Sequence, residues 1–318
     1  MPFTFSHPLL AVPLKKAIPF LSVSGLILGS MAPDLEYFTA MQSYRSIGHS
    51  FGGFLVLGLP ICIALAVIFH RIVKPALPAF LPSTGGLNRF VRDWIGAAGG
   101  SAPAGGWILF TLSAIIGYFT HVFFDGWTHR YGWFALRVPF MIERIGPFGV
   151  YYLLQLGLSL LGAAVPAAWL LVKWRRWRKQ RSTDGQALSS RRGEREKVAF
   201  TAIAAGLASG AALLAGKLAL APDKLFLNMW VVAPFTALAA ALFTAALLHE
   251  ARRNSRLPQA WSALLAIAAA VAVSTLLRYF FETGTASWVV YHWLLSALLI
   301  VAAYAVNPLQ RGKLRKSV

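Results

Sequence analysis

The chain has 318 residues, of which 57% are hydrophobic and 13% are charged, and its mean hydropathy is +0.61. Soluble domains are typically about 45–50% apolar and about 25% charged, so this composition excludes an ordinary water-soluble protein. The excess comes from apolar runs of membrane-spanning length. These runs are continuous rather than alternating, which predicts an all-α, polytopic helical membrane protein and not a barrel.

The net charge of +19 does not indicate a nucleic-acid partner, because the basic residues follow the membrane topology described below. The single cysteine, Cys62, lies inside an apolar run, which excludes a disulfide framework and a thiolate metal site. Residues 1–10 lack a basic segment followed by an apolar core. We therefore expect no cleavable signal peptide, and the first spans would direct insertion.

The first apolar stretch, residues 17–38, is broken by prolines and glycines and contains Asp34. It predicts a short helix that lies at the interface or dips into it. The alternative is a true span, which Lys15 and Lys16 favour. A span here would move the N-terminus to the cytoplasm and separate His7 from the other candidate site residues.

Seven further runs of about 20 residues each predict membrane spans. Gly206 and Gly210 give one of these runs a GxxxG spacing, which is consistent with close helix packing. We expect the Pro-, Gly- and Ala-rich stretch 74–103 to be a loop. The predicted spans lie near 51–70, 104–124, 149–172, 198–220, 228–249, 259–277 and 286–305.

Four segments that alternate correctly to share one side carry most of the 30 basic residues, and the positive-inside rule assigns that side to the cytoplasm. The chain is thus expected in the bacterial inner membrane, with an extracytoplasmic N-terminus and a cytoplasmic C-terminus. A metal-site half, 1–148, would hold two spans, and a five-span hydrophobic half, 149–318, would follow. The four basic segments are 71–103, 173–197 (also interpretable as an anchor to anionic lipid), 250–257 and 306–318.

Potential metal ligands are concentrated in the first 129 residues. Histidine and aspartate are unfavourable in hydrocarbon, are usually retained there for a function, and bind zinc and similar ions. The predicted topology places all of them on the extracytoplasmic face. Without thiolates, this set suits a hydrolytic zinc or a dinuclear site. The candidates are His7, Asp34, His49, His121, Asp125 and His129.

The spacing of His121 and Asp125 stacks both side chains on one face of a helix, and His129 extends that stripe if the helix continues past Gly126. The alternative is an interfacial histidine with a carboxylate partner. Asp34 follows a proline, a pattern that is also typical of an ordinary turn. The convergence of six such residues on one face favours a metal site over these separate structural roles.

Arg45 and Arg130 are candidate substrate-binding residues, because arginine pairs well with phosphate. Their alternative role is that of interfacial cations whose charged ends reach water. The membrane lipid and a phosphoester substrate are the expected partners. The oligomeric state is left open.

The opening Met1-Pro-Phe-Thr-Phe-Ser-His7-Pro8, the Gly29-Ser-Met-Ala-Pro-Asp34 element and Gly48-His49-Ser50 resemble a bacterial membrane family catalogued as domain of unknown function 4184. The order of these residues, with the later His-x-x-x-Asp, is also similar to inner-membrane metal-dependent hydrolases and, more distantly, to zinc-dependent phospholipase C.

The phospholipase resemblance implies up to three zinc ions, with Asp34 as the general base or as a ligand that shares that task. It also implies a later His-x-x-x-Glu, which this chain lacks, although Glu36 or Glu143 could substitute. One or two divalent ions, zinc by preference, are therefore expected. His129 is a looser match, because its spacing from Asp125 is shorter than in the phospholipases.

Two functions follow as hypotheses. The first is a membrane-embedded metal-dependent hydrolase that acts on a lipid or lipid-linked phosphoester at the extracytoplasmic face. The second is a non-catalytic scaffold or a transporter with a structural metal site. Transporters tend to carry polar residues near the midplane of their spans, and the last four spans have almost none, which favours the hydrolase.

Overall fold

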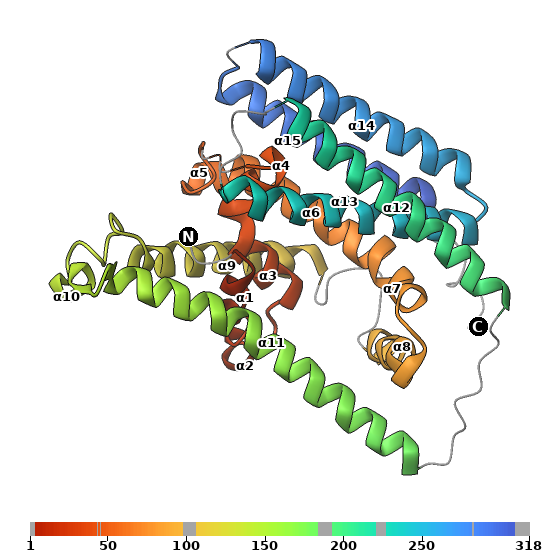
Figure 1. Cartoon of the computed structure of the whole chain (residues 1–318), viewed down its shortest axis with the longest axis horizontal. Helices are drawn as coiled ribbons and strands as arrows, with labels where there is room; N and C mark the ends of the chain where they lie inside the picture. Colours follow the sequence, from red (N-terminus) through yellow and green to blue (C-terminus); the bar gives the residue numbers. More distant parts are fainter. Residues whose placement is uncertain are drawn as a thin grey trace. The chain divides into compact units, whose positions relative to one another are not determined.

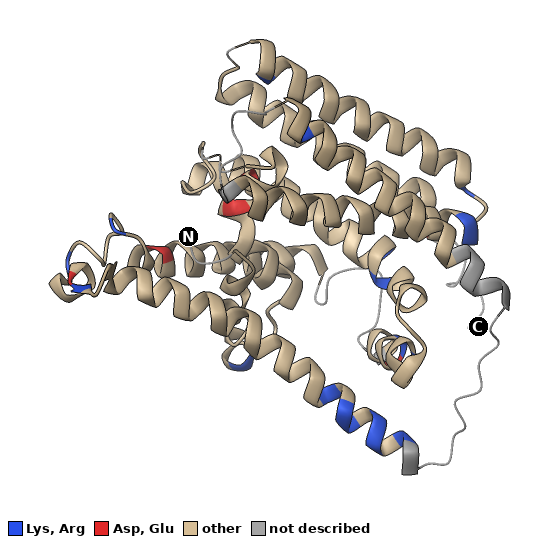
Figure 2. Cartoon of the chain, in the orientation of Figure 1, with Lys and Arg blue, Asp and Glu red and all other residues tan. Residues whose placement is uncertain are grey.

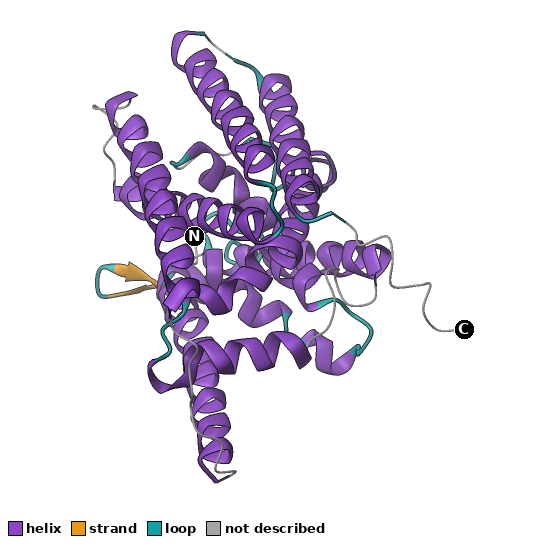
Figure 3. Cartoon of the chain, turned by 90° about the vertical axis from the view of Figure 1, so that its right-hand side faces the viewer, coloured by secondary structure: helices purple, strands orange, loops and turns teal. Residues whose placement is uncertain are grey.

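The structure is a computed structural model, and it is built almost entirely of helices (Figure 1). The one sheet in the described residues is a two-stranded antiparallel hairpin of β1 (Arg144–Ile145) and β2 (Phe148–Gly149), drawn in orange in Figure 3. The residues described are 4–42, 44, 46–97, 106–183, 193–220, 227–281 and 283–308.

Seven helices are long and apolar enough to cross a membrane, which confirms the seven predicted spans and a multi-pass membrane protein. The first span is one uninterrupted helical run. It consists of α5 (Phe51–Gly53), α6 (Leu59–Ile68), α7 (Lys74–Phe80) and the π-helical turns between them. The other six spans lie in α9 (Gly106–Thr128), α11 (Val150–Thr183), α12 (Gly193–Leu220), α13 (Leu227–Arg253), α14 (Leu257–Phe280) and α15 (Thr285–Val306).

The N-terminal segment consists of short helices. Its longest helix, α3, has nine residues and is about 14 Å long, less than half of the ~30 Å hydrocarbon core. Residues 17–38 contribute no helix that is both long and apolar enough to cross a membrane, and their expected position at the interface stays a prediction. The short elements are η1 (Thr4–Ser6), α1 (His7–Ala11), α2 (Leu14–Ala17), α3 (Val23–Met31), η2 (Ala32–Asp34) and α4 (Leu35–Ala40).

Glycines bring α3 into backbone contact with the span α9. A side chain at Gly29 would collide with the backbone of Ala114, and one at Gly117 would collide with the backbone of α3. Ser113 adds a hydrogen bond, since its hydroxyl accepts from the backbone N–H of Ser22 at 2.8 Å. These contacts hold α3 against the first half of α9.

The first span continues ten residues beyond its predicted end. The expected loop at 74–103 is wrong for its described part, because α7 is helical and α8 (Leu87–Ala97) follows after a short turn. Pro75 has no N–H to donate to the carbonyl of Arg71, and the side-chain amide of Asn307 donates to it instead at 2.9 Å. The buried Arg71 guanidinium donates in return to the Asn307 carbonyl through one of its terminal nitrogens, and it lies over the Tyr304 ring at 4.3 Å.

The chain forms two compact units, and the predicted division at residue 148 stays a prediction. In the second unit, Gly206 and Gly210 lie against the backbone of α13 at Ala241 and Ala237, so the GxxxG spacing does mark close packing. In the first unit, α11 extends into a basic end near Lys173 and Arg181, blue in Figure 2. The first unit holds 1–36, 45–62 and 102–187, and the second holds 37–44, 63–101 and 188–318.

Candidate metal centre

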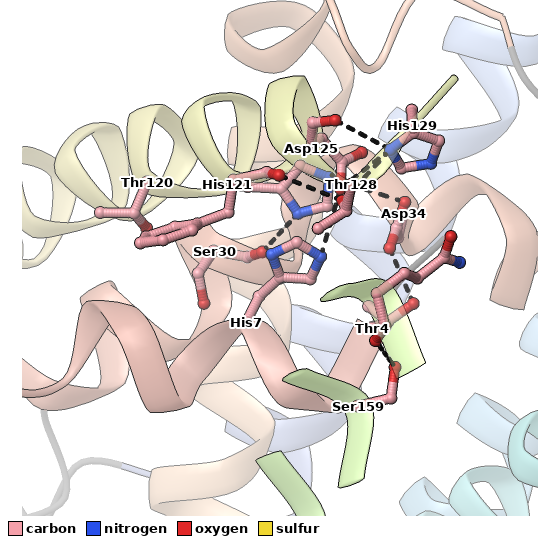
Figure 4. A network of polar contacts seen from close by, with 12 residues as sticks. Thr4, His7, Ser30, Asp34, Thr120, His121, Asp125, Thr128, His129 and Ser159 are labelled. Atoms are coloured by element: carbon pink, nitrogen blue, oxygen red, sulfur yellow. Dashed lines mark hydrogen bonds and ion pairs between the residues drawn. The ribbon is translucent and has the colours of Figure 1, made fainter. Parts of the chain in front are cut away.

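Two candidate ligands come from the last turns of α9. The helix continues past Gly126 to Thr128, so His121 and Asp125 lie on one face, and the His121 Nε2 atom is 3.3 Å from Asp125 Oδ2. His121 Nδ1 lies 2.8 Å from the backbone carbonyl of Ser30 on α3, which makes Nδ1 the N–H donor when the ring is neutral (Figure 4). The Nε2 lone pair then faces the carboxylates, as metal-ligating histidines require.

Asp34 is the last residue of the 3-10 turn η2, directly after Pro33, and its side chain is fully buried. The hydroxyl of Thr4 donates to its Oδ2 atom at 2.8 Å. The Oδ1 atom points to the histidines, at 3.6 Å from His49 Nε2 and 3.8 Å from His121 Nε2. One oxygen is therefore restrained while the other faces the cluster.

His7 begins α1 and is buried. Its ring stacks on that of His121, with centroids 3.9 Å apart, and its Nε2 atom lies 3.6 Å from Asp125 Oδ1 (Figure 4). The N-terminal helix is thus on the same side of the unit as the end of α9, as expected if residues 17–38 do not span.

His49 lies in a loop that two other side chains hold. Glu36 accepts hydrogen bonds from the backbone N–H groups of Ser46 and Gly48, at 3.1 and 2.6 Å. The Tyr118 hydroxyl donates to the carbonyl of His49 at 2.9 Å. Glu36 is therefore bound to this loop and fixes the position of His49.

The remaining predicted site residues are less closely associated. His129 Nδ1 lies 3.7 Å from Asp125 Oδ1 but 2.9 Å from the backbone carbonyl of Asp125, and the side chain is 34% exposed. Arg130 is exposed, with its guanidinium over the ring of Tyr131. Arg45 lies outside the described residues, and Glu143 is exposed in the connection after α9. The substrate-binding roles of the two arginines stay predictions.

The histidine–carboxylate distances in the core of the cluster are 3.3–3.9 Å. They exceed the usual 2.7–3.2 Å of a hydrogen bond, but neighbouring ligand atoms around a tetrahedral zinc ion are about 3.3–3.6 Å apart. Four of the ligand atoms are buried and have no hydrogen-bond partner within the described part of the chain. They are His7 Nε2, Asp34 Oδ1, His121 Nε2 and Asp125 Oδ1. Buried polar atoms are normally satisfied, so this donor set fits a divalent cation.

The two oxygens of Asp125 face different histidines. Oδ2 is near His121 and His49, at 3.3 and 3.9 Å, while Oδ1 is 3.6 Å from His7. Potential ligand atoms form two groups whose members lie within 4.8 Å of one another: His7, Asp34 and His121, and His49, His121 and Asp125. His121 belongs to both groups. The expected number of one or two ions stays a prediction.

Burial sets the protonation of the ligands that lie outside the spans. It lowers the pKa of His7 to about 3, with a further contribution from the adjacent His121. Burial also raises the pKa of Asp34 to about 6. At neutral pH His7 is therefore an uncharged imidazole and Asp34 is mostly ionised, which are the forms that bind a metal.

Sequence reasoning missed the orienting role of four residues: Thr4, Ser30, Glu36 (which it considered only as a substitute ligand) and Tyr118. The position of Tyr118, three residues before His121 on the same helix face, is the one local signal that could have identified any of them. The other three act across segments that meet only in the folded chain.

Comparison with known proteins gives one match. No curated protein and no solved structure matches the chain. A family model described as "Domain of unknown function (DUF4184)" matches residues 1–250, which include all six candidate ligands and the first four spans. The chain therefore belongs to the DUF4184 family.

Proposed function

We propose that this protein is a membrane-embedded, metal-dependent hydrolase that acts on a lipid or lipid-linked phosphoester. The observation that carries the proposal is the set of buried, unpartnered ligand atoms at metal-ligand spacing at the end of the span α9. Bound there, a divalent cation would lower the pKa of a water molecule and stabilise charge on phosphoryl oxygens. The charge bias of the sequence supports an extracytoplasmic site in the bacterial inner membrane.

The chain's own residues have distinct roles in this proposal. His121, His49 and Asp125 hold the cation with Asp34, whose Oδ1 faces the cluster. Asp34 is also the proposed proton acceptor, because its Oδ1 atom faces the cluster in which a metal-activated water molecule would lie. Thr4 keeps the Asp34 carboxylate in one orientation.

The competing proposal is a non-catalytic scaffold or transporter with a structural metal. The almost complete burial of Asp34, His7 and His121 favours that alternative, because a structural site is closed whereas a hydrolytic site needs an open position. The partial exposure of Asp125 and His49, at 15% and 14%, favours hydrolysis, because it gives the cluster one side that water can reach.

Metal analysis of the purified protein tests the proposal. We expect about one or two equivalents of metal in the wild type and almost none after both His121 and Asp125 are replaced by Ala. A Thr120→Val variant is the matched control, because Thr120 is on the same helix and donates to the Gly117 carbonyl rather than facing the ligands. It should keep its metal.

Phosphoesterase assays then separate the two proposals. A hydrolase should lose turnover when a chelator removes the metal, without unfolding. Metal content without turnover on any phosphoester would favour the scaffold. A wild type without metal, or a double variant with wild-type metal content, would exclude the metal site itself.

A further inference from the structure

The connection between the spans α9 and α11, residues 129–149, has an unusual surface. It contains the short helix α10 (Pro139–Ile142) and the β1–β2 hairpin, and it includes large apolar side chains that are 41–79% exposed. Loops that face water seldom carry such a concentration. These side chains are Tyr131, Trp133, Leu136, Phe140, Ile142, Ile145 and Phe148.

This connection is folded, so its apolar exposure does not come from a lack of structure. The backbone N–H groups of Phe134 and Ala135 both donate to the carbonyl of Gly126 at 3.1 Å. The Phe134 ring stacks on Trp127 with centroids 4.6 Å apart. Gly132 packs so closely on Gly126 that a side chain would not fit there. One face of the connection thus packs against α9, and the remaining large apolar side chains are exposed.

Charged residues among the exposed apolar side chains are mostly arginines. Arg137 lies over the Trp133 ring at 4.0 Å and donates to the Trp133 carbonyl at 3.1 Å, while Arg144 donates to the Pro147 carbonyl. Glu143 is the single acidic residue between 129 and 149. Aromatic rings combined with arginine are typical of the membrane–water interface, where rings enter the acyl boundary and guanidinium groups meet phosphates.

We infer that residues 129–149 lie in the headgroup region of the bilayer that α9 and α11 cross, with Trp133 and Phe140 inserted toward the acyl chains. The two flanking spans hold both ends of the connection at the membrane surface. Its excess of arginine complements lipid phosphates and would oppose pairing with the same surface of a second copy. The occupant of this surface is therefore lipid.

This placement bears on the metal centre. The connection is hydrogen-bonded to the backbone carbonyl of Gly126, and Gly126 directly follows Asp125 in α9. Insertion of the connection would hold Asp125 and His121 at the depth of the lipid head groups. A phosphoester could then reach the cluster from within the bilayer. This last step rests on the proposed hydrolase function, whereas the contact with lipid does not.

Spin-label accessibility in nanodiscs tests the inference without any activity assay. In a Cys62→Ala background, Trp133→Cys and Phe140→Cys would each be labelled. Leu160→Cys, 71% exposed in the span α11, is the control for the acyl region, and Lys179→Cys at the exposed basic end of the same helix is the control for water. Labels at 133 and 140 should be several-fold more accessible to oxygen, and less accessible to a water-soluble nickel complex, than the label at 179.

Two results would overturn the inference. Nickel accessibility at 133 and 140 equal to that at 179 would place the connection in water. Exclusion of both reagents from 133 and 140 would show that protein covers the surface, and light scattering would then identify a second copy. Since the labelled residues are exposed, labelling should not disturb folding, and circular dichroism of the Cys62→Ala background and of each labelled variant checks this.

Discussion

Two fully buried histidines, one in each compact unit, show how the same residue type acquires different roles. His121 and His292 both place Nδ1 near a backbone carbonyl, at 2.8 and 2.9 Å. The Nε2 atom of His292 is 2.8 Å from the Thr39 hydroxyl, so its hydrogen bonds are complete. That of His121 has no such partner and faces carboxylates. Burial alone therefore does not mark a candidate ligand, and what distinguishes His121 is that its unpartnered Nε2 atom faces two carboxylates.

The largest expected effect comes from removing each histidine in turn. His121→Ala should lower metal affinity more than about 100-fold, because removal of a ligand exceeds the 10–100-fold typical of residues that only orient ligands. His292→Ala should leave metal affinity within about twofold, since its contacts are complete without a cation. Competition with a chelating dye measures both. If both variants lost the same metal affinity, the distinction drawn between His121 and His292 would be wrong.

A smaller effect on metal affinity is expected from two threonines whose hydroxyls donate to another segment of the same unit. Thr4 orients Asp34, and Thr236 donates to the carbonyl of Phe38 in the second unit. Thr4→Val should reduce metal affinity about 10–100-fold, as is usual for groups that orient ligands. Thr236→Val should not change it. If both variants bind metal like the wild type, then Asp34 does not depend on Thr4 for its orientation.

The smallest effect on metal affinity is expected from glycines that pack against a neighbouring helix. Such glycines occur in both units. Gly29→Ala and Gly206→Ala would each push a methyl group into a neighbouring helix and should destabilise the protein by roughly 1–3 kcal/mol. Only Gly29→Ala should also weaken metal binding, because α3 carries Ser30 and leads to Asp34. Gly157→Ala, where no atom lies within 4 Å, is the control. Thermal unfolding in detergent, with and without metal, measures the difference. Equal metal affinity in the Gly29 and Gly206 variants would show that α3 does not position the ligands.

The number and approximate positions of the membrane spans could be predicted from the sequence, because a continuous apolar run has few stable conformations in hydrocarbon. The end of the first span was not predictable in this way. Arg71 and Lys74 indicated an end, yet the helix continues to Phe80. The Arg71 guanidinium and carbonyl each form a hydrogen bond with Asn307, which is 236 positions away in the sequence. No local pattern contains that contact.

For the site, the sequence by itself determined the types of candidate ligand and the pairing of His121 with Asp125, because helical spacing alone places those two side chains together. It also indicated that residues 17–38 do not span, which keeps His7 on the same side as α9. Only the tertiary structure decided that His7, Asp34 and His49 reach the same point, and that Glu36 supports the His49 loop. These positions depend on backbone packing at Gly29 and Gly117 between elements about 90 residues apart, where shape rather than periodicity sets the distance.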